Sequence, residues 1–123
     1  MVKILIVAHC ALGNAFMEAV EHIMPGESKN IRTFCVEHFT HLADIEAALI
    51  KRCHDLNDKS GVLILTDLVG SSPYNAVKKV VQSDIISVTG LNLPMLLKVL
   101  NYRSLPLKAL AKKAMEAGQK GIF

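Results

Sequence analysis

Four short apolar runs, separated by segments with a helical pattern, constrain the fold of this chain most. The runs span residues 3–8, 31–36, 61–66 and 85–89, and the first, third and fourth are nearly continuous in Ile, Leu and Val. Runs this short and unbroken are typical of strands that are covered on both faces. The alternation of strand and helix predicts an α/β fold: an open, mainly parallel four-stranded sheet with helices on both faces.

The connections between these runs predict the order of the strands. Right-handed crossovers place the first strand centrally, the second on one side and the third on the other, so the expected order is 2-1-3-4. The chain reverses direction between the first and third strands, and ligands of such sheets bind beyond the carboxyl ends of the strands at this point.

Capping residues predict where three helices begin or end. Ser72 followed by Pro73 is typical of an N-cap and a first helical residue, and Asn92 with Pro94 repeats this pattern. We expect the last helix to end at Gly118, because glycine is common just beyond the end of a helix.

Length and composition indicate one globular domain over residues 1–123. Hydrophobic residues make up 51% of the chain and charged residues 20%. No apolar stretch approaches the roughly 20 residues of a membrane span, and the N-terminus lacks a signal-peptide cleavage pattern, so we expect a cytoplasmic protein. The net charge of +3 is mild. Because the basic residues are not interleaved with aromatic ones, nucleic-acid binding is disfavoured.

The cysteines and histidines do not show the spacing of a metal site. Cys10, Cys35 and Cys53 are an odd number of widely spaced residues, which favours free thiols over a disulfide framework or a zinc site. His38 and His41 flank a loop without a third ligand nearby. We therefore expect no metal and no other cofactor.

A histidine and an aspartate follow the two strands at the reversal point. His9 comes directly after the first strand and Asp67 directly after the third, so we expect them to be neighbours. Gly70, Ser71 and Ser72 follow Asp67 and lead into a helix, where backbone N–H groups, hydroxyls and the helix dipole favour an anion. A carboxylate that holds Nδ1–H leaves the Nε2 lone pair free as a nucleophile. The pattern indicates a phosphorylatable histidine, with Gly70, Ser71 and Ser72 binding phosphate.

Over its whole length, the sequence resembles the mannose-type enzyme IIA domain of the bacterial phosphoenolpyruvate:sugar phosphotransferase system (PTS). The matching features are the strand ending in His9, the D-x-x-G-x-S-P-x-N-A segment from Asp67 to Ala76, and "GLNLPML" from Gly90 to Leu96. The resemblance implies a phosphotransferase in which His9 accepts a phosphoryl group from the phosphohistidine protein HPr. His9 would pass this group to a histidine of a IIB domain during sugar uptake.

Further properties follow from the same resemblance. It implies that Asp67 orients His9 and that Ser72 and the loop N–H groups from Gly70 onward lie beside the phosphoryl group. It also implies a homodimer paired through the sheets, in which a C-terminal strand reaches across and "KGIF" is a candidate for this short antiparallel strand. Association with a membrane permease would occur only through IIB. Two features depart from the family: Cys10 replaces the usual glycine after the histidine, and Leu68, Val69 and Ser71 replace an aromatic and paired glycines.

Two other functions remain open at this point. The chain could be a stand-alone regulatory phosphoprotein, or the phosphocarrier subunit of a dihydroxyacetone kinase, because those subunits share this domain. A receiver domain or a flavin-binding domain is disfavoured, since "AHCALG" carries no acidic cluster and Tyr74 is the single aromatic residue close to the site in sequence. The sugar is determined by other components and is not encoded in this chain.

Overall fold

A four-stranded parallel sheet forms the centre of the computed structural model, which describes residues 1–9, 11–39, 41–68 and 72–123. The strands are β1 (Lys3–Ala8), β2 (Ile31–Cys35), β3 (Val62–Thr66) and β4 (Ile85–Thr89). Their order is β2-β1-β3-β4, with all three pairings parallel, which confirms the predicted topology. β2 and β3 are each one residue shorter than predicted, because Val36 begins a short 3-10 turn and Gly61 has a φ of +94°.

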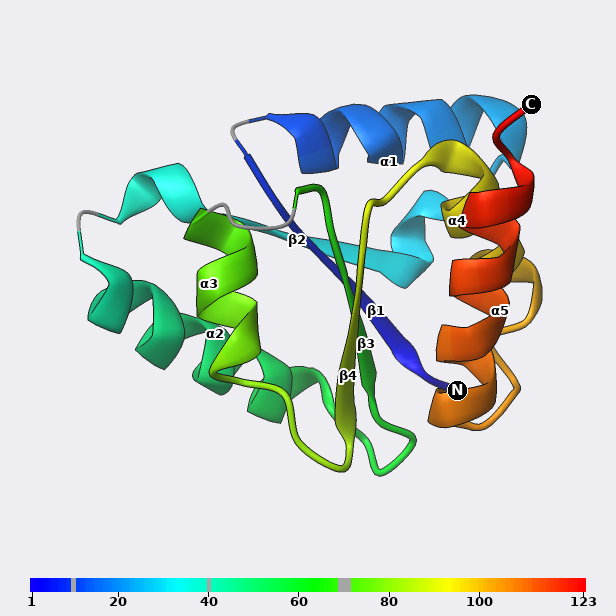
Figure 1. The fold of residues 1–123 in the computed structure, drawn as a ribbon. Coiled ribbons are helices and arrows are strands. Elements are labelled where there is room, and N and C mark those ends of the chain that lie inside the picture. Colours follow the sequence, from blue (N-terminus) through cyan, green and yellow to red (C-terminus); the bar gives the residue numbers. More distant parts are fainter. Residues whose placement is uncertain (10, 40, 69–71) are drawn as a thin grey trace.

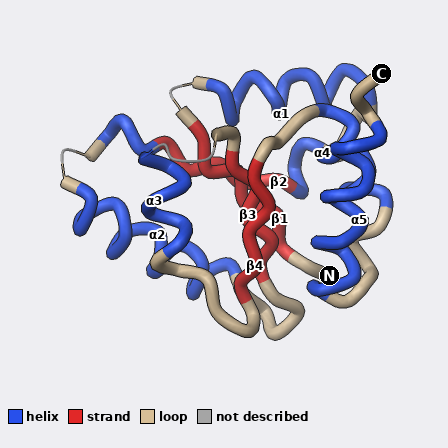
Figure 2. The backbone as a smooth tube through the Cα atoms, in the orientation of Figure 1, coloured by secondary structure: helices blue, strands red, loops and turns tan. Residues whose placement is uncertain are grey.

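Helices cover both faces of the sheet (Figure 1, Figure 2). On one face pack α1 (Leu12–Ile23), α4 (Leu93–Asn101) and α5 (Leu107–Lys120), and on the other α2 (Leu42–Leu56) and α3 (Ser72–Lys78). Short 3-10 turns, Ser28–Asn30 and Val36–His38, flank β2. Within the described ranges, no helix combines the length and apolar character needed to cross a bilayer.

Neighbouring residues of the central strands pack into opposite cores. Ile4 and Ile6 lie in the core beneath α1, α4 and α5, whereas Leu5 and Val7 lie in the core beneath α2 and α3. All four side chains are at most 1% exposed. Burial on both faces explains why the strand reads as an unbroken apolar run.

The C-terminal segment differs from the prediction. α5 continues through Gly118 to Lys120, and within the single chain residues 121–123 belong to no strand, so a strand in "KGIF" that pairs across a dimer stays a prediction. Gly118 is buried inside the helix, where an added Cβ would lie 2.8 Å from Met95 Cε. The Gly118 carbonyl also accepts a hydrogen bond from Asn92 Nδ2 at 3.1 Å. Gly118 therefore allows α4 and α5 to pack closely and does not end the helix.

The predicted start of α4 is confirmed. The Asn92 side chain accepts a hydrogen bond from the Met95 N–H at 3.0 Å, and a proline occupies the first turn. The N-cap role predicted for the Ser72 side chain stays a prediction. α3 starts at this residue, whose side chain lies outside what the structure describes.

Candidate active site

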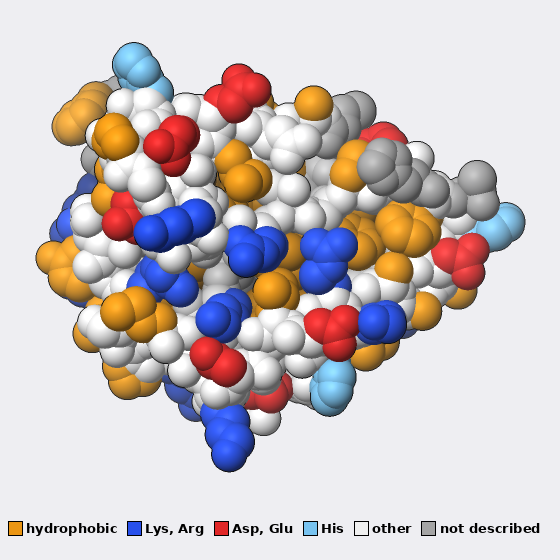
Figure 3. Space-filling model, turned by 180° about the vertical axis from the view of Figure 1, so that it is seen from behind, with side chains coloured by type: hydrophobic (Ala, Val, Ile, Leu, Met, Phe, Trp, Pro, Cys, Tyr) orange, Lys and Arg blue, Asp and Glu red, His pale blue; other side chains and the backbone are white. Residues whose placement is uncertain are grey.

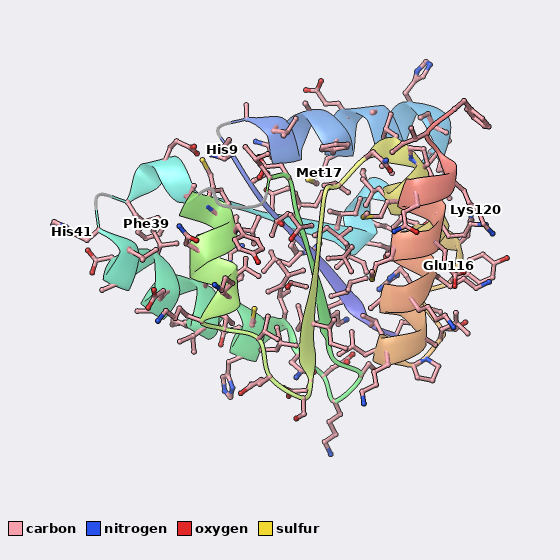
Figure 4. All side chains as sticks on the ribbon, in the orientation of Figure 1. His9, Met17, Phe39, His41, Glu116 and Lys120 are labelled. Atoms are coloured by element: carbon pink, nitrogen blue, oxygen red, sulfur yellow. The ribbon has the colours of Figure 1, made fainter. Side chains whose placement is uncertain are left out.

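His9 and Asp67 lie side by side at the carboxyl end of the sheet. β1 and β3 are adjacent, with Val7 opposite Thr66, so the residues that follow both strands leave the sheet at the same edge. The His9 backbone N–H donates to Asp67 Oδ2 at 3.0 Å, and the ring atom Nδ1 lies 2.7 Å from the same oxygen. Figure 4 shows His9 where β1 ends and α1 begins. The sheet topology thus brings together two residues that are 58 positions apart.

The Asp67 carboxylate is held by N–H groups on both of its oxygens. Besides the two contacts from His9 to Oδ2, the Leu68 N–H donates to Oδ1 at 2.9 Å. Burial by itself raises the pKa of Asp67, but the hydrogen bonds from the His9 ring and backbone lower it, and the pKa lies below its ordinary value of 3.8. Asp67 is therefore ionised at neutral pH.

An ionised Asp67 determines which nitrogen of His9 carries the proton. A carboxylate only accepts hydrogen bonds, so the contact at Nδ1 requires an N–H there. In the neutral ring the lone pair then sits on Nε2. The His9 side chain is 41% exposed whereas that of Asp67 is 12% exposed. The arrangement leaves the nucleophilic nitrogen on a partly exposed ring, and the carboxylate that orients this ring is less exposed.

The amino-terminal ends of α1 and α3 lie at the same edge of the sheet as His9. The Leu12 N–H donates to the His9 carbonyl at 3.0 Å, so α1 begins one turn after the histidine. α3 begins at Ser72, five residues after Asp67. Helix N-termini carry partial positive charge and favour anions. Of the predicted phosphate-binding residues, Gly70 and Ser71 lie outside the described residues, as does Cys10, so their roles stay predictions.

Two threonines that the sequence analysis did not single out support the strand that carries Asp67. Thr66 is fully buried, and its Oγ1 donates to Thr89 Oγ1 at 2.9 Å on the neighbouring strand. The Thr66 carbonyl accepts the Leu91 N–H at 2.9 Å. These bonds fix the end of β3 against β4 just before Asp67. In the sequence, the feature that could have identified Thr66 is a polar residue at the end of an otherwise apolar strand.

His41 at the start of α2 and Cys53 within this helix lie apart from this site. His41 lies at the start of α2 and points away from the molecule (Figure 4). Among the described residues, no group of three His, Cys, Asp or Glu side chains could hold a metal ion. Cys53 is a free thiol buried between α2 and the sheet, and the Cys35 thiol donates to Glu37 Oε2 at 3.2 Å.

A family model and a solved structure that are similar to this chain both describe PTS IIA proteins. The family model EIIA-man, described as PTS system fructose IIA component, matches residues 3–115. Phosphotransferase system component EIIA from Streptococcus agalactiae is 27% identical with a TM-score of 0.83, over 100% of this chain and 96% of that one. No curated protein sequence matches the chain.

Two more distant structures share the fold. The mannose/sorbose specific IIA subunit from Enterococcus faecalis is 20% identical with a TM-score of 0.84, over 99% of this chain and 92% of that one. A sigma-54 interaction domain protein from Enterococcus faecalis is 10% identical with a TM-score of 0.72, over 98% and 93% of the two chains.

Proposed function

The chain belongs to the EIIA-man family of PTS IIA components, and on this premise we propose that it is a phosphotransferase that carries a phosphoryl group on Nε2 of His9. The observation that supports this most directly is the 2.7 Å contact between His9 Nδ1 and Asp67 Oδ2. It leaves Nε2 as the nucleophile of an exposed ring. We propose phospho-HPr as the donor and a IIB-type histidine as the acceptor.

The transfer needs no acid–base step at His9. The Nε2 lone pair forms a bond to phosphorus while the N–P bond of phospho-HPr breaks, and the electron pair of that bond returns to the donor imidazole. The His9 ring becomes positively charged as the new bond forms, and the Asp67 carboxylate stabilises this charge through Nδ1–H. In the second transfer a nitrogen lone pair of the IIB histidine forms a bond to phosphorus while the N–P bond at Nε2 breaks, and the electron pair of that bond returns to Nε2. Catalysis then consists of positioning and charge stabilisation.

We further propose that N–H groups of residues 70–72 bind the oxygens of the phosphoryl group. Two features support this role: α3 starts at Ser72, and α1 starts one turn after His9. Both helices direct the positive ends of their dipoles toward the edge where Nε2 lies.

Labelling with HPr, enzyme I and phosphoenolpyruvate tests the proposal. We expect acid-labile, base-stable phosphorylation of the wild-type protein and none of His9→Ala. His22→Ala is the matched control, because His22 lies on the exposed surface of α1 away from Asp67. Wild-type labelling of a folded His9→Ala variant would show that the phosphoryl group is carried elsewhere.

The identity of the acceptor decides between sugar transport and the two alternatives. The phosphorylated protein is mixed in turn with a IIB domain and with the nucleotide-binding subunit of a dihydroxyacetone kinase. Rapid loss of label to IIB supports the transport role. Loss to the kinase subunit supports the kinase role, and retention against both favours a regulatory phosphoprotein.

A further inference from the structure

A small basic pocket lies at the amino-terminal edge of the sheet, at the other end of β1 from His9. Its volume is about 130 Å³, and four cationic residues from separate parts of the chain line it together with Ile4 and Asn30: Lys3, Lys29, Arg32 and Arg103. Figure 3 shows several Lys and Arg side chains close together in the middle of the face that is turned away in Figure 1. Four positive charges around one concavity need an explanation, because they repel one another.

Carboxylates near the pocket balance only part of this charge. Lys3 Nζ lies 3.4 Å from Asp58 Oδ2, and both side chains are substantially exposed. Asn30 Nδ2 donates to Glu27 Oε2 at 2.8 Å, which places a second carboxylate beside the pocket. In the described part of the chain, none of the ion pairs within 4.0 Å involves Lys29, Arg32 or Arg103. The pocket therefore keeps an excess of positive charge.

Backbone carbonyls hold both guanidinium groups in place. Arg32 Nη1 donates to the carbonyls of Lys29 at 2.7 Å and Ile31 at 3.2 Å. Arg103 Nε donates to the Val2 carbonyl at 3.3 Å. Each guanidinium has five N–H donors, so both retain donors for another acceptor. Arginine side chains that are oriented in advance lose less conformational entropy when they bind an anion.

A second cavity adjoins this pocket and shares Arg103. Its volume is about 430 Å³, and Lys59, Ser60, Ser104 and Pro106 are among the residues that line it. Hydroxyl groups and a further lysine there suit the polar remainder of a small molecule whose charged group occupies the first pocket.

We propose that Lys3, Lys29, Arg32 and Arg103 form a binding site for a phosphate group, free or as part of a small phosphate ester. A phosphate monoester carries a charge of about −1.5 to −2 at neutral pH and offers three strong acceptor oxygens, which matches two guanidinium groups and two ammonium groups better than a single carboxylate does. The six residues of β1, at about 3.3 Å each, separate this site from His9 by about 20 Å. Both sites can be occupied at once.

Titration with inorganic phosphate, followed by amide chemical shifts at constant ionic strength, tests the site. We expect saturable shifts at residues 2–4, 29–32 and 103, with a Kd on the order of 1 mM. Shifts at residues 9–12 and 67–72 report the proposed phosphoryl site separately. Arg32→Gln should weaken the distal binding by roughly tenfold, because a charge-assisted hydrogen bond is lost, and should leave phosphorylation of His9 by phospho-HPr unchanged. Arg103→Gln should have the same two effects.

Lys112→Gln is the matched control, because Lys112 is exposed on α5, does not line the pocket, and its removal changes the net charge equally. Equal weakening in Arg32→Gln and Lys112→Gln, shifts that do not saturate, or shifts confined to the His9 end would each overturn the proposal.

A second experiment uses phosphatidylcholine vesicles with and without phosphatidic acid. Sedimentation that depends on phosphatidic acid and Arg32 supports the site with a lipid headgroup as its source. Binding of inorganic phosphate without sedimentation supports it with a soluble ligand.

Discussion

Replacing Asp67 by asparagine tests the central contact of the site, because it removes the charge and keeps the shape. The carboxylate accepts three hydrogen bonds, two on Oδ2 from His9 and one on Oδ1 from Leu68. An amide has one oxygen, so its NH₂ group must face N–H donors on one side. If NH₂ faces Leu68, that backbone bond is lost. If it faces His9, the backbone bond to His9 is lost and the ring takes the tautomer protonated on Nε2.

Both orientations slow phosphorylation. A hydrogen bond to a charged group contributes about 1.5 to 3 kcal/mol and a neutral one about 1 kcal/mol, so the exchange costs about 0.5 to 2 kcal/mol where the ring gains charge. This is about 2- to 30-fold in rate. Population of the wrong tautomer slows the reaction further, and in serine proteases the corresponding substitution costs about 10⁴-fold. We expect a loss of about 10- to 10³-fold for Asp67→Asn, because no second proton transfer depends on this aspartate.

The same substitution has a smaller effect on stability, which depends on pH. A lost backbone hydrogen bond at a largely buried side chain costs about 1 to 2 kcal/mol. The pKa of Asp67 is lower in the folded protein than its ordinary value of 3.8. Its ionised form therefore stabilises the fold above about pH 4, and this contribution is lost as the pH falls through the lower folded pKa. The stability difference between wild type and Asp67→Asn should shrink below about pH 4.

Rapid-quench transfer from phospho-HPr measures the rate, and urea unfolding at several pH values measures the stability. Asp55→Asn is the control, because it removes the same charge from an exposed carboxylate on α2 that pairs with Lys51. It should phosphorylate at the wild-type rate. If folded Asp67→Asn also reacts at that rate, the carboxylate does not orient the nucleophile and the reasoning from the 2.7 Å contact is refuted.

Three further predictions follow from other parts of the molecule. Gly61→Ala should lower the free energy of unfolding in urea more than Gly90→Ala, by about 1 to 3 kcal/mol, because the added carbon is crowded only at residue 61. Both residues have positive φ, but a Cβ at Gly61 would lie 2.8 Å from Leu107 Cδ2 while one at Gly90 meets nothing within 4 Å; equal losses would contradict this. Burial raises the pKa of Cys53 to about 11, so a thiol reagent at about pH 8 should modify it only after unfolding, as mass spectrometry of peptides will show. Sedimentation at micromolar concentration should give the mass of a homodimer, and a mass of one chain would contradict that prediction.

The sequence by itself determined the sheet and the pairing of the two central site residues. The apolar runs are long enough to identify strands, and the handedness of crossovers leaves one simple order for them. Once that order is known, His9 and Asp67 must meet, because each follows a neighbouring parallel strand. This inference needs only the local pattern and the direction of the chain.

Side-chain partners that depend on packing could not be predicted in this way. Gly118 has the sequence character of a helix end, yet its contact with Met95 shows that it serves the packing of α4 against α5. The bond between Thr66 and Thr89 requires the register of β3 and β4, which the sequence pattern does not specify.

Only the tertiary structure assembled the basic pocket at the amino-terminal edge. Lys3, Lys29, Arg32 and Arg103 come from β1, the turn before β2, β2 and the segment after α4. Each one is an ordinary surface cation in the sequence. Their proximity follows from how α4 returns the chain to the start of β1, where Arg103 Nε donates to the Val2 carbonyl. Contacts across 101 positions are set by the packing of whole elements, and no local periodicity encodes them.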